Sequence, residues 1–112
     1  MPCVNLSTNV SLDGVDTAPI FSEVIKAVAS IIGRAETHVM VLLKGSIPIS
    51  FNDNEEPAAF GEVISMGGIN SEVKKKLIST IGSILETKLS ISKSRFFLKV
   101  FDTTAMRFQS KM

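Results

Sequence analysis

Pro2 follows directly behind Met1, and its position gives it a possible chemical role. If the methionine is excised, Pro2 presents a secondary amine as the first group of the chain, and an unprotonated amine can act as a base. The alternative is that proline is simply tolerated as the second residue. The first residues do not decide between these interpretations, so the answer depends on what the remaining chain builds around Pro2.

Length, composition and charge favour one small domain, residues 1–112, that associates with other subunits. The chain is 45% hydrophobic with a mean hydropathy of +0.30, so we expect apolar surface buried against other copies. Twelve basic and 11 acidic residues give a net charge of +1, which argues against nucleic acid and against a basic membrane-binding face. Cys3 is the single cysteine and no Cys/His metal spacing exists, so we expect no disulfide, metal or cofactor.

Hydrophobic periodicity predicts two β-α-β units in succession. Alternating or β-rich segments predict strands, and apolar residues three and four positions apart predict helices. Asp16 or Thr17 can cap the first helix, and Gly33 can end it. The predicted strands are residues 3–9, 38–44, 59–66 and 95–101, with a short extended piece at 47–51, and the predicted helices run from Pro19 to Gly33 and from Asn70 or Ser71 to Leu89.

This order of elements belongs to the α/β (α+β) class. Right-handed crossovers would place two helices on one face of a four-stranded sheet. The other face also needs a cover, because a strand such as VMVLL, residues 39–43, is apolar at every position. Self-association of three or more sheets around an axis would supply it.

Several segments together resemble one known family, the macrophage migration inhibitory factor / D-dopachrome tautomerase family, most closely its plant branch. They are MPC, NLSTNV, FSEVIKAVASIIGR, VMVLLKGSIPISF, PAAFGEVISMGGI and SRFFLKVFD. The resemblance is colinear over residues 2–102 and leaves 103–112 as a divergent tail. It implies a β-α-β-β-α-β subunit, a homotrimer with pockets at the subunit interfaces, and an N-terminal proline that acts as base in keto–enol tautomerisation.

The same resemblance assigns the pocket residue by residue. Pro2 corresponds to the catalytic proline. The substrate-binding positions are Arg34, Ser65, Met66, Phe97 and Lys99, and the family's tyrosine at the position of Phe97 comes from the neighbouring subunit. Arg34 replaces the family's lysine and could grip a carboxylate, or it could be a solvated cation at a helix end. Ser65 and Met66 could instead be ordinary strand residues.

Two pocket positions depart from the family pattern, and both bear on the activity. Phe97 replaces a tyrosine and lacks its hydroxyl, and Lys99 replaces an asparagine and adds a cation. We therefore expect weak or altered tautomerase activity toward small enolisable carboxylates, or none. The alternative is a non-enzymatic, cytokine-like signalling protein in stress or defence that docks on a receptor-type partner. His38 matches an aromatic position at the pocket rim, where a surface or structural role is the simpler interpretation.

The last three residues suggest a location. Ser110, Lys111 and Met112 resemble the peroxisomal targeting tripeptide, whose usual form is Ser-Lys-Leu. The sequence therefore predicts recognition by the peroxisomal import receptor. A chance match, with a cytoplasmic protein, is the alternative.

Overall fold

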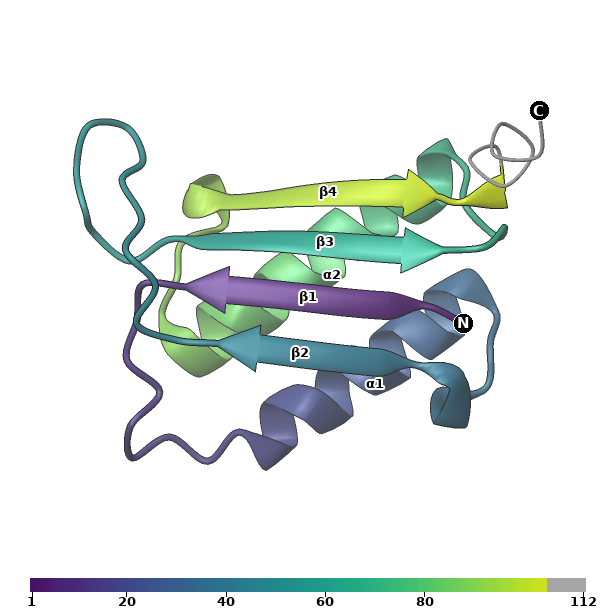
Figure 1. Ribbon diagram of the computed structural model, residues 1–112, viewed down its shortest axis with the longest axis horizontal. Helices are drawn as coiled ribbons and strands as arrows, with labels where there is room; N and C mark the ends of the chain where they lie inside the picture. The colour runs from purple at the N-terminus through teal and green to yellow at the C-terminus, as the bar shows by residue number, and fades with distance from the viewer. Residues whose placement is uncertain (105–112) are drawn as a thin grey trace.

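The computed structural model describes residues 1–104, and the fold follows the predicted order β-α-β-β-α-β (Figure 1). Two short 3-10 turns, η1 and η2, precede the second and fourth strands. The elements are β1 (Cys3–Thr8), α1 (Ala18–Ile32), η1 (Glu36–His38), β2 (Met40–Lys44), β3 (Ala59–Ser65), α2 (Ser71–Leu89), η2 (Lys93–Arg95) and β4 (Phe96–Asp102).

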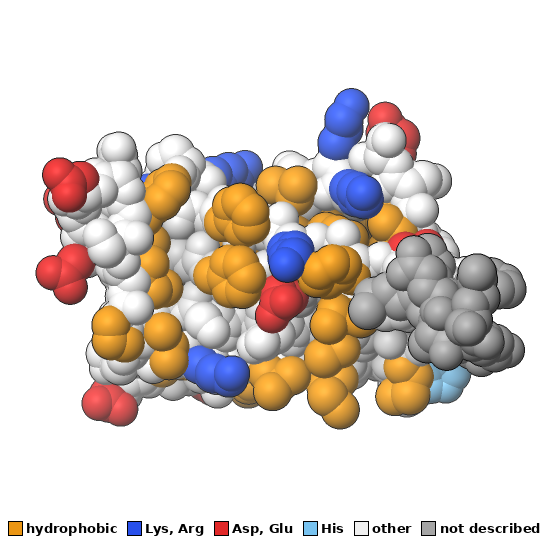
Figure 2. All heavy atoms as spheres, turned by 45° about the horizontal axis from the view of Figure 1, so that its top comes forward, with side chains coloured by type: hydrophobic (Ala, Val, Ile, Leu, Met, Phe, Trp, Pro, Cys, Tyr) orange, Lys and Arg blue, Asp and Glu red, His pale blue; other side chains and the backbone are white. Residues whose placement is uncertain are grey.

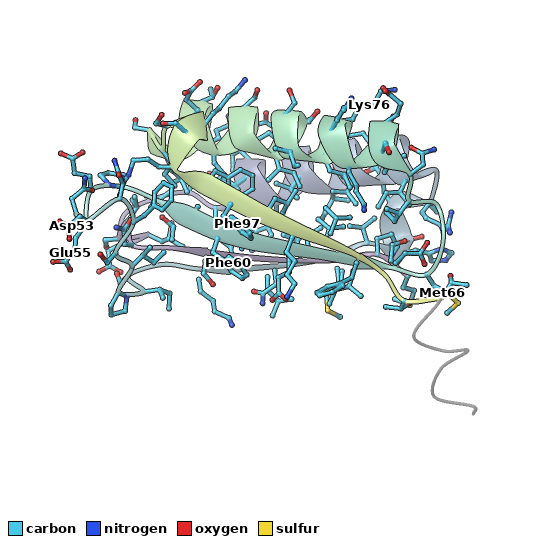
Figure 3. The ribbon with its side chains drawn as sticks, turned by 90° about the horizontal axis from the view of Figure 1, so that it is seen from above. Asp53, Glu55, Phe60, Met66, Lys76 and Phe97 are labelled. Carbon is cyan, nitrogen blue, oxygen red and sulfur yellow. The ribbon has the colours of Figure 1, made fainter. Side chains whose placement is uncertain are left out.

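The four strands form one mixed sheet in the order β2-β1-β3-β4. β1 is parallel to β2, β3 is parallel to β4, and the two central strands β1 and β3 are antiparallel. Each parallel pair needs a long crossover, which α1 and α2 provide. Both helices consequently cover the same face of the sheet, as the ribbon seen from above makes plain (Figure 3).

The core lies between that face and the helices. Strand residues alternate between the two faces, so every second side chain of the central strands points toward the helices. The buried core consists of Val4, Leu6, Ile20, Val24, Val28, Ile32, Ala59, Val63, Leu77, Ile81, Ile84, Leu85, Leu89 and Ile91. The core residues from α1 and α2 lie at the three- and four-residue spacing that predicted the helices.

The opposite face of the sheet carries large apolar side chains that nothing in the described chain covers. Met40 is 54% exposed and Phe97 is 63% exposed, and Leu42, Phe60 and Ile64 are exposed as well. Figure 2 shows hydrophobic side chains gathered on the molecular surface, interrupted by a few charged ones. We call this surface, built from the outward residues of β1–β4, the open sheet face. A surface patch of this kind usually marks an interface.

Local signals place the helix ends. Asn70 is the N-cap of α2, and its side chain accepts a 2.8 Å hydrogen bond from the Val73 amide. Thr17 stands at the N-cap of α1 without a side-chain cap bond, while Asp16 accepts a 3.1 Å bond from the Ala18 amide. Gly33 ends α1 in the left-handed conformation, at φ 81°.

The predicted start of the second strand and the short extended piece at 47–51 were wrong. His38 belongs to the turn η1, and β2 begins only at Met40. Residues 47–51 form no strand; Phe51 makes an isolated bridge with Asn54 instead. This loop is held by Arg95, whose guanidinium donates to the carbonyl oxygens of Pro57, Phe51 and Glu56 at 2.9, 3.2 and 3.1 Å. Hydrogen bonds from the side chain of Arg95, at the end of η2, therefore hold the loop, and strand pairing does not.

Within residues 1–104 there is no helix with the length and hydropathy to cross a bilayer.

Candidate active site at the end of the sheet

Pro2 is buried at one end of the sheet, next to the last residue of β3. Cys3 pairs with Ile64 in the antiparallel register, so the next position sets Pro2 beside Ser65. The Pro2 carbonyl accepts a 3.0 Å hydrogen bond from the Met40 amide, which extends the pairing of β1 with β2. Met1, in contrast, is 73% exposed. Figure 1 shows this terminus at the end of the sheet where β3 ends.

Arg34 reaches the same end of the sheet from α1. The left-handed Gly33 turns the chain out of the helix, and Arg34 then lies over the turn that follows β3. Its Nη2 donates to the Met66 carbonyl at 3.0 Å, and its Nη1 donates to the Gly33 carbonyl at 3.3 Å. The guanidinium has five N–H groups, so these two bonds leave further donors for an anion.

Ser65 has a structural task in this arrangement. Its side chain is 1% exposed, and its hydroxyl donates to the Gly67 carbonyl at 2.9 Å. The side chain of Met66 is 45% exposed and points away from the core. The structure therefore brings Pro2, Arg34, Ser65 and Met66 to one end of the sheet.

Phe97 and Lys99 of the same chain lie elsewhere. Phe97 pairs with Phe60, five positions before Ser65 on β3, or about 16 Å along the strand. Its ring stacks on Phe60 with centroids 5.9 Å apart and an interplanar angle of 11°. Figure 3 shows this aromatic pair well away from Met66. The ammonium of Lys99 lies 4.5 Å from the centroid of the Phe101 ring.

An apolar cavity of about 200 Å³ adjoins the aromatic pair. Phe60 and Phe97 form one wall, and Arg95 with its bound loop closes the other. The lining residues are Ile49, Ser50, Phe51, Ala58, Ala59, Phe60, Arg95 and Phe97. Phe97 thus lies toward the opposite end of the sheet from Pro2 and Arg34, while Lys99 pairs with Glu62 in the middle of β3.

Asp102 is a site residue that sequence reasoning missed. Its Oδ1 accepts hydrogen bonds from the Gly67 amide at 3.1 Å and from the Thr104 amide at 2.9 Å. Hydrogen bonds from the Thr104 backbone and side chain, and from the Gly67 backbone, hold the pKa of Asp102 below its ordinary 3.8, while desolvation acts in the opposite direction. An aspartate at a strand end gave no distinctive signal, because its partner turn is 35 residues away.

Two other reactive side chains of residues 1–104 make none of the hydrogen bonds of this cluster. His38 is exposed on η1, and Cys3 is a half-buried free thiol. In the part of the chain that the structure describes, no three His, Cys, Asp or Glu residues are grouped in a way that could hold a metal ion. The targeting residues 110–112 lie outside the described residues.

Fold and sequence comparisons agree on one family. The family model described as "Macrophage migration inhibitory factor (MIF)" matches residues 1–111. A macrophage migration inhibitory factor homolog of Trichuris trichiura is 28% identical over 102 residues, which cover 91% of this chain and 89% of the relative.

Solved structures give the same result. The macrophage migration inhibitory factor of Trichinella spiralis superposes with a TM-score of 0.82 at 27% identity, over 89% of this chain and 88% of that one. The homologue from Prochlorococcus marinus superposes with a TM-score of 0.82 at 25% identity, over 89% and 87%. The chain belongs to the macrophage migration inhibitory factor family, as the sequence predicted. A special closeness to the plant branch stays a prediction.

We predict that Gly68→Ala destabilises the protein more than Gly14→Ala. Both glycines have positive φ, 76° and 75°, so alanine costs roughly 1–2 kcal/mol of backbone strain at either position. A Cβ on Gly68 would also lie 2.9 Å from Cγ2 of Ile32, whereas a Cβ on Gly14 meets nothing within 4 Å. Urea unfolding should show an extra loss of about 1–3 kcal/mol for Gly68→Ala. Equal losses would mean that the turn after β3 is not packed tightly on α1.

Proposed function

We propose that the protein is a keto–enol tautomerase for small enolisable carboxylates, with Pro2 as the catalytic base. One observation carries the proposal: the buried Pro2 shares one end of the sheet with the Arg34 guanidinium and the Ser65–Met66 backbone. Family membership supports it at the coarser level of a macrophage migration inhibitory factor-like protein.

The proposed reaction moves one proton and needs no cofactor. After removal of Met1, the Pro2 nitrogen takes a proton from the carbon next to the substrate carbonyl, and the electron pair of that bond forms the enol. The protonated amine then returns the proton to the carbonyl oxygen, and the reverse sequence ketonises an enol. An apolar setting disfavours a charged amine, so burial keeps the base unprotonated. Arg34 holds the substrate carboxylate with its remaining N–H groups.

We further propose that the active assembly is a homotrimer. Phe97 lies about 16 Å along the strand from the level of Ser65, too far from Pro2 of its own chain to line its pocket, so we propose that a neighbouring copy supplies it together with Lys99 of the same strand. The open sheet face offers the apolar surface for such a neighbour. In the described chain the Oδ1 of Asn5, on this face, is buried without a hydrogen-bond partner, and a donor from a neighbouring copy would satisfy it.

Phe97 and Lys99, which form the pocket wall that we assign to the neighbouring copy, differ from the family pattern. This difference supports weak or altered tautomerase activity. Phe97 offers a ring without a hydroxyl donor, and the ammonium of Lys99 rests on Phe101. This gives the second candidate function its basis: a non-enzymatic, cytokine-like signalling protein with a receptor-type partner. The two candidates differ in whether Pro2 turns over substrate.

Replacing Pro2 tests the enzyme directly. We predict that Pro2→Gly lowers kcat/KM for phenylpyruvate tautomerisation at least about 100-fold, because a positioned general base contributes about 10²–10⁴. Pro48→Gly is the matched control, since it removes an exposed loop proline and should leave the rate within twofold. Mass spectrometry of each variant reports whether Met1 is removed.

Two outcomes would contradict the proposed tautomerase activity of Pro2. Equal, measurable rates for wild type and Pro2→Gly would remove Pro2 from the mechanism. No measurable rate in either protein, with Met1 removed, would favour the signalling alternative for these substrates.

We also propose that the protein is imported into peroxisomes through Ser110-Lys111-Met112. A fluorescent reporter that ends in residues 103–112 should colocalise with a peroxisomal marker. The same reporter without Met112 should stay diffuse, because the receptor reads the terminal tripeptide. A diffuse signal from the reporter with the complete tail would contradict import and leave the cytoplasmic alternative.

A further inference from the structure

The peptide group between Met66 and Gly67 is held at both of its polar ends by charged side chains. Its carbonyl oxygen accepts the 3.0 Å bond from Nη2 of Arg34. Its N–H donates the 3.1 Å bond to Oδ1 of Asp102. The carbonyl and N–H of a trans peptide point in opposite directions, so the two side chains grip the group from opposite sides. Rotation of this peptide would break two charge-assisted hydrogen bonds at once.

The neighbouring groups fix the rest of the turn. The Ser65 hydroxyl holds the Gly67 carbonyl at 2.9 Å, which orients the next peptide group. Gly67 and Gly68 both have positive φ, so this short turn runs through backbone conformations that few residues adopt. Without side-chain hydrogen bonds to select one backbone conformation, such a turn could adopt several.

Asp102 also connects this turn to the chain beyond β4. It pairs with Ser65 in the parallel register, and the Thr103 amide continues the pairing with a 2.9 Å bond to the Ser65 carbonyl. The same Oδ1 of Asp102 that accepts a hydrogen bond from the Gly67 amide also accepts one from the Thr104 amide, at 2.9 Å. One carboxylate oxygen thus joins the turn after β3 to the residues where the chain leaves the sheet.

We infer that Asp102 is a positioning residue that orients the Met66–Gly67 peptide and, through the Met66 carbonyl, holds Arg34 in place for a substrate carboxylate. We call the two hydrogen bonds of Arg34 and Asp102 to the Met66–Gly67 peptide the clamp. The inference rests on the proposed tautomerase function for its consequence in binding, but the clamp itself is independent of catalysis. Asp102 acts through the turn and Arg34, and it belongs to neither the predicted pocket residues nor the catalytic group.

The carboxylate is charged throughout the neutral range. Its pKa is lowered in the folded state, chiefly by the Thr104 bonds and then by the Gly67 amide. A lowered pKa means that the clamp contributes its full stability above the pKa of the unfolded chain, and that this contribution is lost as the pH falls through the folded value, below 3.8. Measurements near pH 7 therefore probe the intact clamp.

Three variants separate the clamp from a general effect on folding. Asp102→Ala removes the acceptor, Asp102→Asn keeps an uncharged acceptor oxygen, and Asp13→Ala removes an exposed carboxylate outside the cluster. In amide hydrogen exchange, Asp102→Ala should speed exchange of the Gly67 and Thr104 amides about tenfold or more. Asp102→Asn should restore part of the protection, and Asp13→Ala should change neither amide.

The effect on substrate binding is measured as the KM of two substrates, one with a carboxylate and one without. With Asp102→Ala, the KM for phenylpyruvate should rise about fivefold, the loss expected for one net hydrogen bond of about 1 kcal/mol, with kcat nearly unchanged. The KM for dopachrome methyl ester, which has no carboxylate for Arg34, should stay the same. Asp102→Asn should fall between wild type and Asp102→Ala for phenylpyruvate.

Each other outcome contradicts a specific part of the inference. Unchanged Gly67 exchange in Asp102→Ala would remove the clamp. Equal KM increases for both substrates would show a structural effect that does not act through Arg34. If wild type is inert toward both substrates, the proposed function fails, but hydrogen exchange of the Gly67 amide still tests the clamp. In that case site-resolved phenylglyoxal labelling should modify Arg34 faster in Asp102→Ala, with Arg95 as the internal reference, and an unchanged rate would overturn the inference.

Discussion

In residues 1–104, two helices cover one face of a four-stranded sheet that carries large apolar side chains on both faces, and the rest of the structure depends on this constraint. The helices bury one face of the central strands, through residues such as Val4 and Val63 at 0% exposure. The other face exposes Met40, Phe60 and Phe97 among others, and each large apolar side chain gains roughly 1.5–3 kcal/mol when fully buried. Burial of these side chains would therefore stabilise an interface on the second face, and other copies of the chain are the partner that we propose for it.

The same constraint explains why the proposed pocket is divided. One end of the sheet holds Pro2 and Arg34, and the other holds Phe97 beside an apolar cavity. Neither end has the catalytic and the aromatic parts together. Copies that pack sheet against sheet around an axis can bring unlike ends into contact. Burial of the open sheet face and assembly of the active site would then be one event.

The sequence predicted the elements better than their connections. Helical spacing and the signals at Gly33 and Asn70 located both helices, because those signals act within a few residues. His38 was assigned to a strand because β-rich residues follow it, but the chain needs the turn η1 to pass from α1 to the sheet. Asp102 could not be recognised, because its role comes from the parallel register of β3 and β4, which sequence periodicity does not contain. The positions of Phe97 and Lys99 relative to Pro2 depend on the same register.

Solution mass is the most direct test of the claim that copies of this chain cover the open sheet face. Light scattering after size exclusion, at micromolar concentration and neutral pH, should give about 36 kDa, three times the chain mass of 12.1 kDa. Replacing Leu42 on the open sheet face with arginine should shift the mass toward that of one chain, since the charge would be buried without a partner. A wild-type mass of 12.1 kDa at micromolar concentration would contradict the account, because Pro2 of one copy and Phe97 of another would then not share a pocket.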